Sequence, residues 1–302
     1  MKYLLVLLIF LFTFISISQE RYHRDKTTID LYDTIVYLRF DMKPLNGIVY
    51  GEFGEFGNFI DGKKDGLHRR WYENGQLEEE SNYLNNSLTG LYKRWNEDGL
   101  LYWESNHKNG KREGLHRRWY ENGQLKEESN YLNDSLIGLN RFWYDNGALK
   151  EEYDVKGDYL TDFEWYNDGT LKEETHRIKL YTKDGRIRWA KHGVYRRWNK
   201  DGLLYWESNH KNGKKDGWVR SWYENGHLKY EYFIKDGNTE GLYRTWYENG
   251  QLEYESFRKD GKRDGQVREW YENGQLKKET NFKNGEQEGQ SRSWKENGVL
   301  EE

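Results

Sequence analysis

The sequence contains no cysteine and a single proline in 302 residues. The absence of cysteine excludes a disulfide framework, a thiolate metal site and a cysteine nucleophile, and it removes most redox chemistry. With one proline, the chain has no proline-rich linker between domains. Apolar residues are also scarce, at 35% of the chain, whereas ordinary globular domains have about 45–50% in a count that also includes Gly. Such a chain cannot bury a large aliphatic core.

What the sequence does have is aromatic residues, charge and glycine. Aromatic residues make up 17% of the chain, with 14 Trp and 25 Tyr, charged residues make up 33%, and there are 31 Gly. Disordered chains have few aromatic residues, and here the rings and glycines recur at fixed spacing. This composition predicts a thin, repetitive β structure.

Residues 1–18 have the features of a secretory signal peptide. Basic Lys2 precedes an apolar stretch over residues 3–15, and Ser16 and Ser18 are placed for cleavage before Gln19. The stretch is shorter than the roughly 20 residues that span a bilayer, so cleavage is expected and not retention as an anchor. We therefore expect an exported protein, in the periplasm, the cell envelope or the extracellular medium.

The charge of the exported chain disfavours two kinds of partner. Without residues 1–18 it has 47 basic and 52 acidic residues, a net charge of −5. Duplex nucleic acid is bound mainly by clustered Lys and Arg that neutralise phosphates. We therefore expect no nucleic-acid partner, and after signal cleavage no association with an acidic membrane surface.

A tryptophan recurs ten times, with a step of 24 residues in seven of nine intervals and steps of 22 and 33 in the others. Four residues after each Trp stands a Gly preceded by Asn or Asp, and two residues further stands a Leu. A fixed period of this length indicates stacked repeat units. The tryptophans are Trp71, Trp95, Trp119, Trp143, Trp165, Trp198, Trp222, Trp246, Trp270 and Trp294. The turn glycines are Gly75, Gly99, Gly123, Gly147, Gly169, Gly202, Gly226, Gly250, Gly274 and Gly298.

Asn-Gly or Asp-Gly between two short strand-like runs is the strongest local signal for a β-hairpin, because Gly accepts a positive φ. We place the loop of the first full repeat at 73–75, as a type I turn with Gly75 as a left-handed bulge, which pairs Trp71 with Leu77. Because side chains alternate between faces, this register predicts one face with Leu67, Arg69, Trp71, Leu77, Glu79 and Ser81 and another with His68, Arg70, Glu78 and Glu80.

In that register, a basic residue two positions before the Trp would face the residue eight positions after it. The first position is Lys or Arg in nine of ten repeats, with Phe163 as the exception, and the second is Glu in five repeats and aromatic in four. Cross-strand ion pairs and cation–π contacts are predicted at these positions. Lys278, placed opposite Arg268, would break the pattern.

The predicted fold is all-β: an elongated array of about ten 24-residue β-hairpin repeats that forms a twisted, antiparallel, single-layer sheet or superhelical ribbon. Residues 19–46 lack the repeat and are expected to form an N-terminal leader or cap, whereas 47–302 form the array. Extra residues near 176–191 indicate an added hairpin.

The unit Trp-Tyr-Glu-Asn-Gly-Gln-Leu-Lys-Glu-Glu at 119–128, with Lys-Asn-Gly-Lys-Lys-Asp-Gly at 211–217, resembles the MORN-repeat variant of bacterial proteins grouped as YwqK-like antitoxins. The resemblance covers residues 47–302. It implies a non-enzymatic β-hairpin array that binds other proteins, in some members as the antitoxin of a toxin–antitoxin pair. A conventional antitoxin acts in the cytoplasm, so export favours an envelope scaffold or immunity against a toxin outside the cytoplasm.

No constellation of catalytic, metal-binding or cofactor-binding residues is recognised. The eight His fall mostly where other repeats carry Tyr, Lys or Gln, without metal-ligand spacing. Adjacent carboxylates such as Glu78, Glu79 and Glu80 would alternate between faces of a strand and so are interpreted as solvated or paired with Arg. We expect no enzyme activity, no metal and no cofactor.

The aromatic stripe, to which Trp103 and Trp206 are added, has two interpretations. It holds the hairpins together and offers a surface to a protein partner, such as a toxin or an envelope protein. Alternatively, exposed rings bind a cell-wall or surface glycan.

Overall fold

The computed structural model describes residues 19–29, 36–39 and 41–301, so the predicted signal peptide at 1–18 lies outside the described residues. The chain divides into two compact units. Unit 1 takes in the described residues up to Leu101 together with 106–111, and unit 2 takes in 102–105 and the chain from Arg112 onward. Strand β10 (Leu101–Lys108) contributes residues to both.

Unit 1 begins with short elements that cover the first hairpin of the array. Strand β1 pairs in parallel with β4, and β2 pairs with β3. Val36, Leu45, Val49 and Phe59 form a small buried cluster there. The described part of 19–46 thus packs as a cap on the hairpin β4–β5. The elements of this unit are β1 (Arg21–His23), η1 (Arg24–Lys26), β2 (Thr27–Ile29), β3 (Val36–Leu38), β4 (Gly47–Gly51), β5 (Gly54–Ile60), β6 (Lys63–Trp71), β7 (Leu77–Leu84), β8 (Ser87–Leu88) and β9 (Gly90–Trp95).

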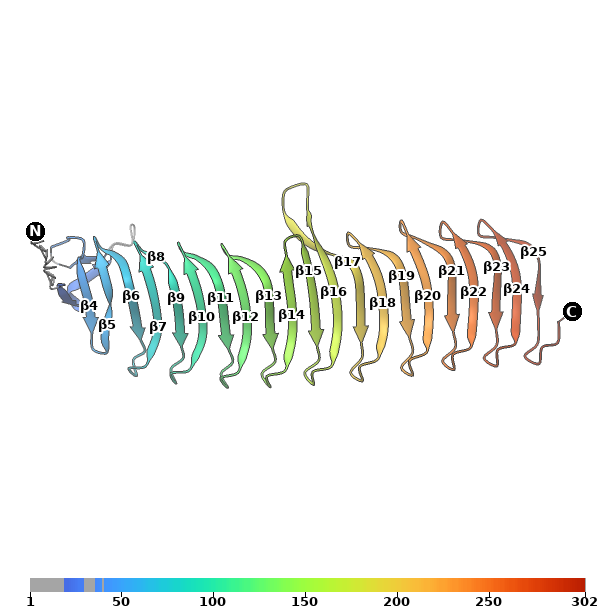
Figure 1. Cartoon of the computed structure of the whole chain (residues 1–302), viewed down its shortest axis with the longest axis horizontal. Coiled ribbons are helices and arrows are strands. Elements are labelled where there is room, and N and C mark those ends of the chain that lie inside the picture. The colour runs from blue at the N-terminus through green and yellow to red at the C-terminus, as the bar shows by residue number, and fades with distance from the viewer. Residues whose placement is uncertain (1–18, 30–35, 40, 302) are drawn as a thin grey trace, which may run out of the picture. The chain divides into compact units, whose positions relative to one another are not determined.

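Unit 2 consists of antiparallel strands, and within it each strand from β11 to β24 pairs with the next strand in chain order (Figure 1). They are β11 (Lys111–Trp119), β12 (Leu125–Leu132), β13 (Ser135–Trp143), β14 (Leu149–Lys156), β15 (Tyr159–Trp165), β16 (Leu171–Tyr181), β17 (Ile187–Trp198), β18 (Leu204–Lys211), β19 (Lys214–Trp222), β20 (Leu228–Lys235), β21 (Asn238–Trp246), β22 (Leu252–Lys259), β23 (Lys262–Trp270), β24 (Leu276–Lys283) and β25 (Glu286–Ser293). The predicted all-β array of hairpin repeats is confirmed.

The extra residues near 176–191 lengthen two strands and do not form a separate pair. Strands β16 and β17 have 11 and 12 residues and remain paired as far as Tyr181 and Ile187. In Figure 1 this yellow-green hairpin projects beyond the neighbouring turns of unit 2. The only helical segment among the described residues is the three-residue η1, so none of the described helices is long enough to cross a bilayer.

Candidate interaction surface

The turn that follows each Trp closes as the sequence predicts. In the first full repeat, the Gly75 N–H donates to the Tyr72 carbonyl at 3.0 Å, and the Tyr72 N–H donates to the Gln76 carbonyl at 2.9 Å. Trp71 then pairs with Leu77. All ten turn glycines have φ between +78° and +89°, a range that residues with a Cβ rarely adopt. The predicted turn and its Trp–Leu pair are confirmed.

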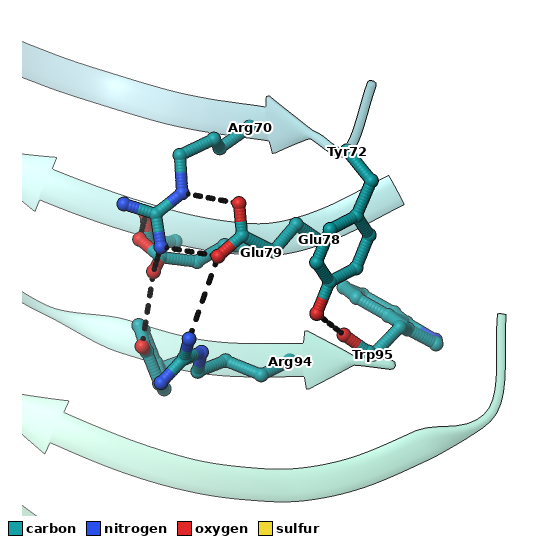
Figure 2. A network of polar contacts seen from close by, with 8 residues as sticks. Arg70, Tyr72, Glu78, Glu79, Arg94 and Trp95 are labelled. Carbon is teal, nitrogen blue, oxygen red and sulfur yellow. Dashed lines mark hydrogen bonds and ion pairs between the residues drawn. The ribbon is translucent and has the colours of Figure 1, made fainter. Parts of the chain in front are cut away.

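In most repeats, tyrosine and asparagine side chains form hydrogen bonds from one turn to the next one along the sheet. The Tyr120 hydroxyl donates to the Trp143 carbonyl, and the Asn122 side-chain amide donates to the Asp145 carbonyl, both at 2.7 Å. Each of these acceptors lies 23 residues further along the chain. In unit 2 the tyrosine bond recurs from Tyr120, Tyr144, Tyr166, Tyr223, Tyr247 and Tyr271. In unit 1 it joins Tyr72 to Trp95 (Figure 2).

The same tyrosine rings also contact lysine. The Lys126 ammonium lies 5.0 Å from the centre of the Tyr120 ring. A cation over an aromatic ring at an exposed site contributes about 0.5–1 kcal/mol. This pair recurs in the turns that contain Tyr144, Tyr166, Tyr223 and Tyr271. Each such ring is therefore fixed by its hydroxyl and by its face.

We call the side of the sheet that carries the ten repeat tryptophans the tryptophan face. Beside these tryptophans runs a ladder of alternating Arg and Glu. Arg196 contacts Glu174 at 3.1 Å and Glu207 at 2.8 Å, while Arg220 contacts Glu207 at 3.3 Å and Glu231 at 3.2 Å. The ladder continues through Arg244 to Glu255. Its arginine side chains are 33–40% exposed, so the ladder lies at the surface.

The ladder corrects the predicted register beyond the Trp–Leu pair. A β-bulge between Arg70 and Trp71 shifts the pairing by one residue, so Arg69 faces Glu80, not Glu79. The partner of the arginine is therefore the residue nine positions after the Trp, which is Glu in all nine repeats that reach it. Arg268 likewise faces Glu279, so Lys278 does not interrupt the pattern. Cross-strand ion pairing was predicted correctly, but with the wrong carboxylate.

The opposite side of the sheet, which we call the serine face, has a row of small buried hydroxyl residues. Ser105, Ser129, Thr175, Ser208 and Ser256 have no exposed surface. Larger neighbours cover them: the Trp206 indole N–H donates to the Ser208 hydroxyl at 3.1 Å. Small residues in the middle of this face let the flanking aromatic and charged side chains close over them.

Trp103 and Trp206 lie on the serine face, so their assignment to the stripe of repeat tryptophans was wrong. Trp206 pairs with Arg197, the residue before Trp198, and neighbours on a strand point to opposite faces. Trp103 packs edge-on against His116, with ring centres 4.6 Å apart, and Arg118 lies over its ring. Both indoles are half-buried, as are all ten repeat tryptophans.

In unit 1, Arg70 on the serine face connects two carboxylates (Figure 2). It donates to Glu78 at 2.7 and 2.8 Å and to Glu79 at 3.1 Å. Arg94 of the next hairpin reaches Glu78 at 3.5 Å. The hydrogen bonds to Glu78 raise the pKa of the Arg70 guanidinium above its ordinary value. The charged residues of this cluster neutralise one another and leave no isolated acid or base.

Two histidines of the serine face are held neutral. Burial, opposed by a hydrogen bond to the Asn58 carbonyl, lowers the pKa of His68 to about 4. Burial and the nearby ammonium groups of Lys191 and Lys215 lower the pKa of His210 to about 4. No group of three or more His, Cys, Asp or Glu side chains among the described residues is arranged to hold a metal ion.

The comparisons with known proteins support the repeat assignment. Five segments match the family model described as the MORN repeat variant, at residues 64–85, 112–133, 215–236, 239–260 and 263–284. No curated protein matches the chain.

Among solved structures, the chain is similar to a pore structure of the Photorhabdus luminescens Tc holotoxin, at 11% identity over 79% of this chain and with a TM-score of 0.18. It is also similar to a crystal structure of TcdB2–TccC3, at 11% identity over 84% of this chain and with a TM-score of 0.18. The chain spans only 16% and 17% of those two proteins, and TM-scores this low carry no functional argument.

Proposed function

We propose that this protein is an exported, non-enzymatic scaffold that binds another protein along its hairpin array. The observation that carries the proposal is the ladder on the tryptophan face, which repeats one pattern of charge and half-exposed indole from strand to strand. Repeat arrays commonly bind partners along such an extended surface. Positive and negative side chains alternate along the ladder. A partner with the complementary charges is therefore held in one alignment, although the surface carries little net charge.

A narrower proposal is that the partner is a toxin, so that the chain acts as an antitoxin or immunity protein. It is supported by the resemblance of the repeats to those of YwqK-like antitoxins. The predicted signal peptide adds that neutralisation would occur outside the cytoplasm. Identification of the partner tests both levels of the proposal.

The experiment is to express the tagged chain, with residues 1–18 retained, in its own host, crosslink it and identify what is recovered from the envelope and medium. The expected result is one stoichiometric protein partner and a chain that begins at Gln19. A partner that is toxic when expressed alone would support the immunity role. Recovery of glycan without protein, or substrate turnover with a defined residue dependence, would overturn the scaffold proposal.

A matched pair of variants links the capture to the ladder. Arg220→Gln interrupts the ladder on the tryptophan face, whereas Arg186→Gln removes an exposed arginine from the β16–β17 turn. Partner recovery is expected to fall for the first variant and to stay unchanged for the second.

A further inference from the structure

The turn at 199–203 in unit 2 lacks the side chains that tie other turns together. Asn199 stands where six turns of this unit have tyrosine, and Asp201 stands where most have asparagine. The Asn199 side-chain oxygen accepts hydrogen bonds from the N–H groups of Asp201 at 3.1 Å and Leu203 at 2.9 Å, so it stabilises its own turn. A carboxylate has no N–H to donate, so Asp201 cannot bind the next turn as Asn225 does.

A hollow of about 650 Å³ lies beside this turn, with Asn199 and Leu203 in its wall. We call it the phenol slot. Aromatic residues form much of its wall, with a lysine beside them: Tyr166, Tyr205, Trp222, Tyr223 and Lys229. Tyr205 is held under the Arg197 guanidinium, 5.5 Å from its ring centre, and lines the slot without filling it.

The following repeat shows which side chain occupies the equivalent position. One repeat later, the ring of Tyr223 lies along the turn, its hydroxyl donates to the Trp246 carbonyl at 2.8 Å, and Lys229 lies 5.2 Å from the ring centre. The equivalent acceptor at the slot is the Trp222 carbonyl, and no tyrosine hydroxyl of the described chain bonds to it. A planar ring with a hydroxyl donor therefore suits the aromatic wall of the slot and its carbonyl acceptor.

We propose that the phenol slot binds a tyrosine side chain of the protein partner, which takes the place of the ring that the chain omits at Asn199. The incoming hydroxyl donates to the Trp222 carbonyl, and the ring packs between the side chains of Tyr166 and Tyr223. The partner's tyrosine would anchor it at one point of the extended surface, as aromatic side chains do in other protein interfaces. This inference depends on the proposed protein-binding function in one respect, because the tyrosine ring comes from the protein partner.

The direct test is titration of the purified protein with N-acetyltyrosinamide, followed by NMR of methyl-labelled leucine. Saturable shifts of Leu203, which lines the slot, are expected. N-acetylphenylalaninamide lacks the hydroxyl donor and is expected to bind about fivefold more weakly. Equal binding of the two probes, shifts spread over all repeats, or stronger shifts with a chitin oligosaccharide would overturn the proposal.

Two variants of the same turn sharpen the test. Asn199→Tyr restores the ring found in the other turns, and we expect it to weaken N-acetyltyrosinamide binding by at least about tenfold, or 1.4 kcal/mol at 25 °C, because the slot is filled. Asp201→Asn restores the asparagine donor to the next turn without filling the slot. The affinity of this variant for N-acetyltyrosinamide is expected to stay within about twofold of that of the parent. Unchanged binding to a folded Asn199→Tyr protein would place the ligand elsewhere.

Partner capture separates the two proposals. If N-acetyltyrosinamide binds but no protein is captured, the scaffold function fails and the slot takes a small phenol. If a partner is captured equally by the parent and by Asn199→Tyr, the scaffold function stands and the tyrosine anchor is overturned.

Discussion

The Tyr120 hydroxyl donates a 2.7 Å hydrogen bond to the carbonyl oxygen of Trp143 in the next turn. Both residues belong to the motif that recurs every 24 residues over most of the array, so the bond recurs with it. The Tyr and Asn of the motif therefore form hydrogen bonds between repeats, whereas the Gly shapes the turn within one repeat.

Replacing Tyr120 with Phe removes this bond and keeps the ring. We expect a loss of about 1 kcal/mol in the free energy of unfolding, because the Trp143 carbonyl loses its donor. Denaturant unfolding and amide exchange at 144–148 would measure it. Tyr181→Phe, at a tyrosine that is 64% exposed, is the control and is expected to change nothing. Equal effects of the two substitutions would contradict the prediction.

Gly123→Val should destabilise the hairpin β11–β12 through the backbone. Gly123 has φ +82°, and a Cβ there would meet no atom within 4 Å, so the cost is conformational and not steric. A β-branched residue in the left-handed region costs about 1–2 kcal/mol. Gly123→Asn is the milder variant, since Asn tolerates this conformation. A thermal melt of Gly123→Val that matches the parent would show that this turn assignment is wrong.

Reversing one charge in the ladder should cost stability in a salt-dependent way. Arg220→Glu places three carboxylates side by side, because Glu207 and Glu231 flank the position. We expect a loss of about 1 kcal/mol at low ionic strength that shrinks in 1 M salt. Arg188→Glu, at an exposed arginine of β17, is the control. Denaturant midpoints at two salt concentrations would decide the matter, and a loss that salt does not reduce would count against the ladder.

Stability should fall on mild acidification because of the buried histidines. Burial and the neighbouring lysines lower the pKa of His210 to about 4 in the folded protein, whereas an unfolded histidine titrates near about 6.5. Below about pH 6.5 the unfolded state therefore binds the proton first, and stability is lost as the pH falls toward 4. Thermal melts of the parent and His210→Gln at pH 7 and pH 5 measure this, and the variant is expected to lose less. An imidazole NMR titration with a midpoint at 6 or above would refute it.

The fold was predictable because one local signal recurs ten times. Asn-Gly or Asp-Gly, with Trp before it and Leu after it, fixed the turn at Glu73–Gly75 and the pairing of Trp71 with Leu77. The further β-bulge between Arg70 and Trp71 was not predicted, because strict alternation assumes that each residue of one strand faces one residue of the other. The sequence does contain the missing signal: Glu80 and its equivalents never vary, whereas Glu79 is replaced by Trp, Tyr or Lys in other repeats.

The ties between turns were missed for a different reason. A hydrogen bond from a side chain in one repeat to a backbone carbonyl in the next leaves no characteristic pair of residue types in the sequence, since every residue has the same carbonyl acceptor. The substitutions carry only a partial trace of it. Tyr and Asn are lost together at Asn96 and Asp98 and again at Asn199 and Asp201, but Asp168 replaces Asn where Tyr166 is kept.

The bonds between turns all run in the same direction, from the side chain of one repeat to the backbone of the following one. An in-frame duplication of one 24-residue unit would therefore create a donor and an acceptor together, without any compensating substitution elsewhere. The two almost identical stretches at 94–114 and 197–217 indicate that parts of the array have been copied, but both contain the turn that lacks the Tyr and Asn donors. The array can change its length during evolution without changing its chemistry.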